Sequence, residues 1–159
     1  MFEEIDGLLK DCRLPFCFDI TENESSCLFI FSPEGEESVA IMIDDLVVSA
    51  PEIPQWKVFG RRQRKPFDDV CAFIRHLYLV DLSMSRFRLT QRADGLYVQI
   101  FISPDADLTT DERQGLINTF LWHVYGEDVV MANHITGEAI LATPSLHGSL
   151  SATEFARSL

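Results

Sequence analysis

Along this chain the apolar residues form extended runs and then a stripe with helical spacing, and this succession occurs twice. Apolar, aromatic-rich runs at 16–20 and 27–31, separated by a polar stretch, predict a β-hairpin. From residue 36 an apolar stripe recurs every three or four residues, which predicts a helix that Pro51 ends. An extended pattern over 55–62 predicts a further strand. The first unit, about 16–64, therefore reads strand, strand, helix, strand.

The second half of the chain begins in the same way. The segment Leu28 to Pro33 reads Leu-Phe-Ile-Phe-Ser-Pro, and Gln99 to Pro104 reads Gln-Ile-Phe-Ile-Ser-Pro. Two extended runs, at 86–91 and 96–103, flank the step Asp94-Gly95. An Asp-Gly step between extended runs is a strong hairpin signal. A second hairpin is therefore predicted.

A helix and a strand complete this second unit. Thr109 and Glu112 have the spacing of a capping box, and the apolar stripe that follows ends near Gly126, a natural helix stop. Runs at 129–135 and 138–142 predict the last strand, with a bend between them. The second unit, about 86–142, thus has the element order of the first.

Three shorter helices are expected outside the repeats. Peripheral helices are predicted at about 2–11 and 152–159, the latter behind a capping box from Ser151 to Glu154. A third helix is expected at 67–76, followed at 77–82 by residues that fit a strand equally well.

These elements predict an α+β fold in one domain, residues 1–159. Two strand-strand-helix-strand units most economically pair their strands into one largely antiparallel sheet with the helices on one face. The fold is then a two-layer sandwich, a relative of the ferredoxin-like arrangement. Its second sheet face stays uncovered unless the extra helices or a second subunit cover it. That face is where function is expected.

Composition fits this picture. A chain of 159 residues with 47% hydrophobic content can build one domain with a substantial core. No apolar run approaches the roughly 18 residues of a membrane span, and the start Met1 to Glu4 lacks the basic flank of a secretory signal. We therefore expect a cytoplasmic protein with no membrane association. The four cysteines include no Cys-x-x-Cys pair and are expected to be reduced and buried.

The charge is distributed unevenly. Residues 1–55 carry 13 acidic and 2 basic side chains, residues 56–92 carry 3 and 9, and residues 93–159 carry 9 and 2. A net charge of −12 argues against general nucleic-acid binding, which depends on neutralising phosphates. The basic middle segment still leaves room for a local anion site.

Four arginines are the candidate binding residues: Arg62, Arg64, Arg86 and Arg88. Strand alternation places Arg86 and Arg88 on one face, opposite Phe87. If the basic run around Arg62 and Arg64 converges with them, the four could hold a phosphate, a carboxylate or an acidic protein segment. The alternative is that these arginines pair with nearby acidic side chains and keep the sheet face solvated.

No motif for catalysis or metal binding stands out. The acidic pairs have no recognisable ligand spacing, the four histidines fit no zinc motif, and a nucleophile elbow and a glycine-rich phosphate loop are both missing. The sequence therefore predicts neither a metal nor a cofactor, and it favours a protein that is not an enzyme. A Cys, His or carboxylate site formed only in space is the alternative.

One segment resembles a known family. Ala50 to Trp56 is similar to an Ala-Pro-x-Ile-Pro-x-Trp segment of a bacterial family of unknown function. Phe87 to Leu89 and Tyr125 to Val129 are also similar to it, so the resemblance spans most of residues 16–142, whereas Gly60-Arg61 departs from its Ala-Phe-like pair. Members are sometimes joined to domains resembling the regulator of ribonuclease activity B, an acidic α+β inhibitor. The resemblance implies a fold and no catalytic residue.

Three hypotheses of function follow. The first is a non-enzymatic bacterial protein that acts through protein contacts, as a regulator or inhibitor of a partner with a basic surface, because strong charge steers association. The second is a small-anion module that uses the four arginines. The third is an enzyme without a recognisable motif. An uncovered sheet face or edge strand would also allow a homodimer.

Overall fold

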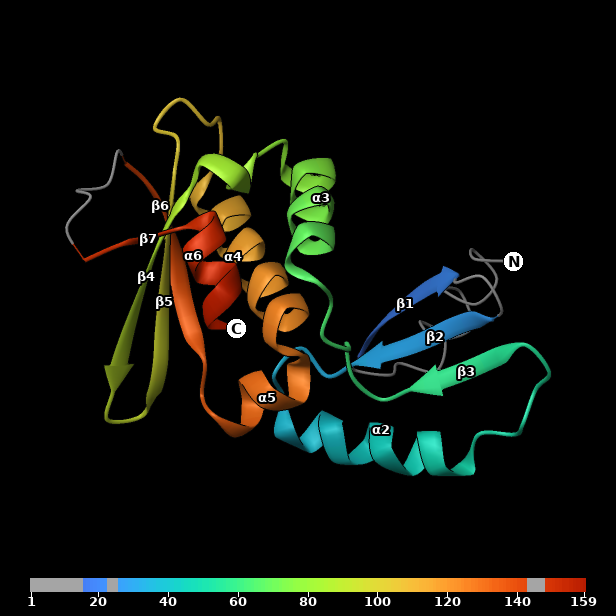
Figure 1. The fold of residues 1–159 in the computed structure, drawn as a ribbon. Coiled ribbons are helices and arrows are strands. Elements are labelled where there is room, and N and C mark those ends of the chain that lie inside the picture. Colours follow the sequence, from blue (N-terminus) through green and yellow to red (C-terminus); the bar gives the residue numbers. More distant parts are fainter. Residues whose placement is uncertain (1–15, 23–25, 143–147) are drawn as a thin grey trace. The chain divides into compact units, whose positions relative to one another are not determined.

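The structure is a computed structural model that describes residues 16–22, 26–142 and 148–159 (Figure 1). The chain divides into two compact units, residues 1–62 and 63–159, which we call unit 1 and unit 2. The α+β class is confirmed, since each unit combines a sheet with helices. The single domain over 1–159 stays a prediction, and the predicted helix at 2–11 lies outside the described residues.

The described elements include the predicted hairpins, helices and crossover strands in their expected order, together with η1, α5 and β7, which were not predicted. Unit 1 contains β1 (Cys17–Glu22), β2 (Cys27–Ser32), α2 (Glu37–Ser49) and β3 (Trp56–Phe59). Unit 2 contains α3 (Phe67–Tyr78), the 3₁₀ turn η1 (Leu82–Met84), β4 (Arg86–Arg92), β5 (Gly95–Ile102), α4 (Thr110–Tyr125), α5 (Glu127–Ala132), β6 (Thr136–Leu141), β7 (Leu150–Ser151) and α6 (Ala152–Ser158).

The single shared sheet that we predicted is wrong. Among the described residues the strands form a three-stranded sheet in the order β1-β2-β3 and a four-stranded sheet in the order β6-β5-β4-β7. Both are mixed, because an antiparallel hairpin is followed by a helix and then by a strand parallel to the hairpin's second strand. A helical crossover returns the chain to its own sheet. Each repeat thus builds a separate sheet.

The core of unit 1 is small. Among the described residues its buried cluster consists of Phe31, Val39 and Ile43, where α2 lies against one face of the sheet. Phe16 meets Phe31 edge-on with ring centres 5.0 Å apart, and further rings of β1 and β2 border this contact. Gly60 allows the chain after β3 to approach α2, because a Cβ there would lie 3.1 Å from the Ile43 side chain.

Unit 2 has a larger core, built around an aromatic stack. Helices α3, α4 and α6 cover one face of its sheet (Figure 1). Phe87 of β4 stacks on Phe155 of α6 at 4.5 Å and on Phe120 of α4 at 5.7 Å between ring centres. All three side chains are fully buried. At Gly137 of β6 an added Cβ would lie 2.2 Å from the carbonyl oxygen of Val98. Any residue other than glycine at position 137 would therefore require the backbone to shift.

Two local predictions need correction. Residues 129–132 of the predicted strand 129–135 belong instead to helix α5 (Glu127–Ala132), which follows Gly126 and begins with Glu127 and Asp128. Acidic residues at a helix start are favoured by the helix dipole, and this signal outweighs the β-branched pair that follows. After α3, Leu79 adopts a left-handed backbone (φ 58°), so the strand alternative for 77–82 is also wrong.

Other local predictions are confirmed. Both capping boxes are formed, the Thr109 and Ser151 side chains each accepting a bond from the backbone N–H of the glutamate three residues later. The Asp94-Gly95 step closes the β4–β5 hairpin. The helices predicted at 67–76 and 152–159 correspond to α3 and α6.

Candidate functional site

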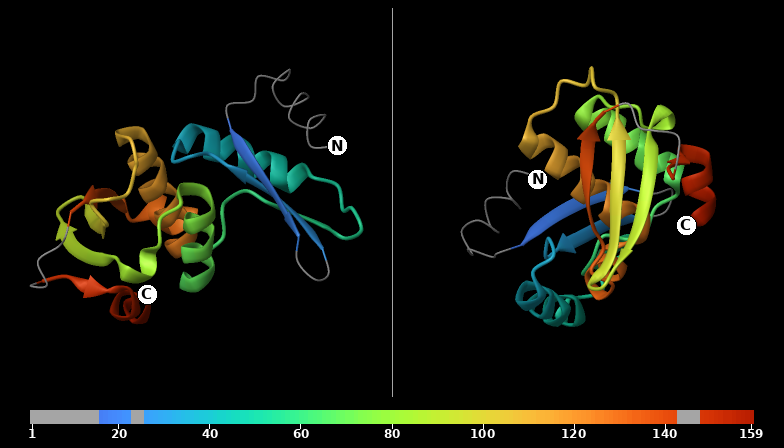
Figure 2. Two further views of the ribbon diagram at one scale, coloured as in Figure 1. Left: turned by 90° about the horizontal axis from the view of Figure 1, so that it is seen from above. Right: turned by 90° about the vertical axis from the view of Figure 1, so that its left-hand side faces the viewer.

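The candidate site is the sheet face of unit 2 that its helices leave open. Alternation puts Phe87 under the helices and its neighbours in β4 on the other side. In the right-hand view of Figure 2 the strands of this sheet lie toward the viewer and the helices of unit 2 behind them. We call this surface the open face. The register assigns to it Arg86, Arg88, Thr90 and Arg92 of β4, Tyr97, Gln99 and Phe101 of β5, and Thr136, Glu138 and Ile140 of β6.

Two arginines of the open face lie on aromatic rings. The Arg88 guanidinium carbon is 5.2 Å from the centre of the Phe101 ring, and that of Arg92 is 3.2 Å from the centre of the Tyr97 ring. Each ring belongs to the residue diagonally across the hairpin. A guanidinium on a ring gains a cation–π contact while its N–H groups, which lie around its edge, can still donate. The rings therefore hold both cations in place.

On the β6 side of the open face lies the carboxylate of Glu138. The Gln99 amide donates to Glu138 Oε1 at 2.7 Å. Burial, followed by the hydrogen bond to the Glu138 carboxylate, raises the pKa of Tyr97, so this phenol stays a neutral donor at pH 7. Glu138 is thus engaged by its own sheet.

Positive charge is concentrated along β4. Arg86 is 4.0 Å from Glu154 at the start of α6, at the limit of an ion pair. Within the part of the chain that the structure describes, no ion pair joins Arg88 or Arg92 to a carboxylate. Surface ion pairs of this kind are worth about 0–1 kcal/mol. All three arginines can therefore exchange their present contacts for those of a ligand.

The other two predicted binding residues lie elsewhere. Arg62 belongs to unit 1, where its side chain is only 10% exposed, 3.0 Å from Asp19 of β1 and 3.9 Å from Glu34. It also donates to the Ser32 hydroxyl of β2. Arg62 therefore holds the elements of unit 1 together. Arg64 of unit 2 is exposed and passes close to Gly126. The structure thus brings together Arg86 and Arg88, on one strand face.

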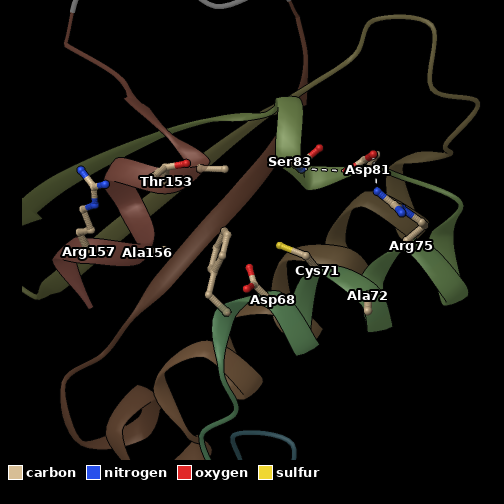
Figure 3. Close-up of a pocket in the computed structure, with 11 residues that line it drawn as sticks. Asp68, Cys71, Ala72, Arg75, Asp81, Ser83, Thr153, Ala156 and Arg157 are labelled. Carbon is tan, nitrogen blue, oxygen red and sulfur yellow. Dashed lines mark hydrogen bonds and ion pairs between the residues drawn. The ribbon is translucent and has the colours of Figure 1, made fainter.

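A concave region of unit 2 lies between α3 and α6. This open pocket of about 580 Å³ is lined by side chains of both helices and of the turn between α3 and β4 (Figure 3). Its Arg75 and Asp81 are paired with each other. Burial, and then the nearby Asp68 and Asp81 carboxylates, raise the pKa of Cys71 to about 11. That thiol is protonated at neutral pH and is a poor nucleophile.

In residues 16–22, 26–142 and 148–159, no group of three or more His, Cys, Asp or Glu side chains is arranged to hold a metal ion. No described helix is both long enough and apolar enough to span a bilayer.

Comparison of the chain with protein-family models, with curated proteins and with solved structures found no match. The resemblance of the segment around Ala50 to Trp56 therefore stays a prediction.

Sequence reasoning missed the aromatic half of the open face. Tyr97 and Phe101 occupy alternate positions of β5 on the side away from the helices, while Val98, Ile100 and Ile102 form the buried side. Alternation within 95–102 carries this information. Apart from Gln99, however, the side chains of this strand are apolar or aromatic, so the sequence gives little sign of which set of residues is buried.

Proposed function

We propose that this is a binding protein that acts through protein contacts, with the open face of unit 2 as its contact surface. The observation that carries the proposal is the row of Arg86, Arg88 and Arg92 along β4, two of them resting on aromatic rings. Arginine and aromatic residues are the types enriched where protein interfaces bind most strongly. Side chains already held in position lose less conformational entropy on binding.

The local charge modifies the kind of partner that the sequence suggests. Net charge alone favours a partner with a basic surface, and unit 1, with 13 acidic and 5 basic residues, accounts for most of that charge. Unit 2 has 12 acidic and 8 basic residues, and three of its arginines lie on one strand face. An acidic partner surface fits the open face, while a basic one would fit the rest of the molecule.

Affinity capture with matched charge reversals tests the proposal. The intact protein is used as bait in an extract of its native cells at low salt, and bound proteins are identified by mass spectrometry. We expect the double variant Arg88→Glu/Arg92→Glu to lose specific partners. Arg157→Glu reverses a charge on α6, which covers the opposite sheet face, and should retain them.

Circular dichroism of both variants controls for folding. Identical partner sets for wild type and the double variant would contradict the proposal, as would the absence of any partner at low salt.

A further inference from the structure

We infer that the open face binds an extended acidic segment of a partner protein, laid along β4 with its carboxylates at alternate positions. The inference rests on the proposed function and specifies the chemistry of the partner. Its basis is the spacing and setting of Arg86, Arg88 and Arg92.

The spacing of the three arginines matches an extended peptide. A strand rises about 3.3 Å per residue, so Arg86 and Arg88 are about 7 Å apart along β4, and Arg88 and Arg92 about 13 Å. An extended segment has the same rise, and its alternate side chains point to one side. Acidic residues at its first, third and seventh positions would therefore each meet one arginine.

The chemistry of the guanidinium groups favours carboxylates. Arg88 and Arg92 use a guanidinium face on Phe101 and Tyr97, which leaves the N–H groups on their edges for a ligand. Carboxylate oxygens accept two parallel bonds from such an edge, and charge-assisted bonds are about twice as strong as neutral ones. Glu138 lies on β6, on the same face but at the other edge of the sheet, and its carboxylate repels an acidic segment. The segment is therefore confined to the β4 side.

The same contacts argue against single-stranded nucleic acid, the other polyanion with an extended backbone. Proteins that bind it stack bases on exposed aromatic rings. Here Arg88 and Arg92 cover the two rings of the open face, and Phe101 is only 9% exposed. The net charge of −12 further weakens attraction of a polyphosphate.

Fluorescence anisotropy with two synthetic peptides tests the inference on the intact protein. The first peptide carries glutamate at its first, third and seventh residues, with threonine and serine elsewhere. The second has the same composition with the three glutamates consecutive, so that the middle one points away from the face. At low ionic strength we expect the spaced peptide to bind about tenfold more tightly, the effect of one charge-assisted contact.

A charge swap locates the peptide. Arg88→Glu should weaken the spaced peptide by about tenfold, and a peptide with lysine at the third position should recover the loss. Arg157→Glu, on α6, should leave both peptides unchanged. If the segment runs antiparallel to β4, glutamates at the first, fifth and seventh residues face the three arginines, so that peptide should bind more tightly than the first, and lysine at its fifth position should recover the loss.

Three outcomes would overturn the inference: equal affinity for spaced and consecutive glutamates, no binding of any peptide, or tighter binding of oligothymidylate that Arg88→Glu abolishes. These outcomes are separable from failure of the proposed function. If Arg88→Glu/Arg92→Glu loses its captured partners while the peptides bind equally, the open face is a contact surface for a partner of another shape. If capture is unchanged, the contact surface itself is wrong.

Discussion

Units 1 and 2 share an element order and differ in what they bury. Each has an antiparallel hairpin, a helix, and a strand parallel to the hairpin's second strand. Among the described residues of unit 1, one helix, α2, lies on the sheet, and the buried cluster consists of Phe31, Val39 and Ile43. In unit 2 two helices from outside the repeat, α3 and α6, join α4, and the cluster includes a stack of three Phe rings. The repeat sets the topology, and the added helices supply the core.

The arginines of the two units differ in the same way. In unit 1, Arg61 donates to the Asp44 carboxylate at 3.1 Å and to the Ala40 carbonyl at 3.3 Å, both on α2, and Arg62 binds the hairpin. In unit 2, Arg88 and Arg92 lie on rings at the surface. The available neighbours decide which role an arginine takes. Where acidic and hydroxyl side chains surround it, the arginine holds elements of its own unit together. Where it rests on an aromatic ring, its N–H groups can still bind a ligand.

The largest expected effect is on the aromatic stack. Phe87→Ala should lower the free energy of unfolding of unit 2 by about 3–5 kcal/mol, because it removes the ring that contacts both helices. Ile43→Ala should destabilise unit 1 by only about 2 kcal/mol, since its half-buried neighbours can collapse into the space.

Tryptophan fluorescence can separate these effects. The chain has two tryptophans, Trp56 in unit 1 and Trp122 in unit 2. Urea unfolding of each core variant is followed in Trp56→Phe and Trp122→Phe backgrounds, so that one unit reports at a time. If both probes shift equally for either core variant, the chain unfolds as one cooperative domain over 1–159, and the contrast between the two cores does not hold.

A smaller effect is expected at Arg62. Arg62→Ala removes its contacts with Asp19, Ser32 and Glu34, and should lower the free energy of unfolding of unit 1 by about 1–3 kcal/mol. The value stays below that of a fully buried ion pair because both carboxylates are about half exposed and remain hydrated.

Arg64→Ala is the matched control, since Arg64 is exposed. It should change stability by less than about 0.5 kcal/mol. Stability is measured by the urea midpoint. If the two substitutions have equal effects, Arg62 has no structural role, and it is again a candidate for ligand binding.

The sequence predicts those features whose causes are local. The capping boxes at Thr109 and Ser151 involve residues three apart, and the Asp94-Gly95 turn involves adjacent ones. The helical stripes of α2 and α3 are visible within one window of residues. Such signals do not depend on the rest of the fold, which is why the class, the two hairpins and the helices α2, α3, α4 and α6 follow from the sequence.

The features that sequence reasoning missed depend on partners far along the chain. Arg62 and Asp19 are 43 residues apart. The sequence therefore does not distinguish an arginine that is paired within the fold from one that can bind a ligand. The separation into two sheets depends on which strand the chain pairs with after each helix: β3 pairs with β2, and β6 pairs with β5. The rings of Tyr97 and Phe101 are assigned to the open face only once Phe87 is known to lie under α4 and α6.

The smallest effect concerns a side-chain helix cap that α4 has and α2 lacks. Thr109 caps α4 with its side chain, whereas the residue before α2, Glu36, makes no such bond. Thr109→Ala should therefore destabilise unit 2 by about 1 kcal/mol, and Glu36→Ala should have little effect on unit 1.

The pH dependence of stability tests whether the charge on Glu112 contributes to the capping box of α4. Hydrogen bonds from the Thr109 hydroxyl and backbone N–H hold the pKa of Glu112 below its usual value. A carboxylate with a lowered pKa in the folded state stabilises that state fully above its unfolded pKa, and the contribution is lost as the pH falls through the folded pKa. The urea midpoint of unit 2 should thus fall less steeply between about pH 5 and pH 3 in Glu112→Gln than in wild type. Parallel curves would mean that the capping box forms without the charge on Glu112.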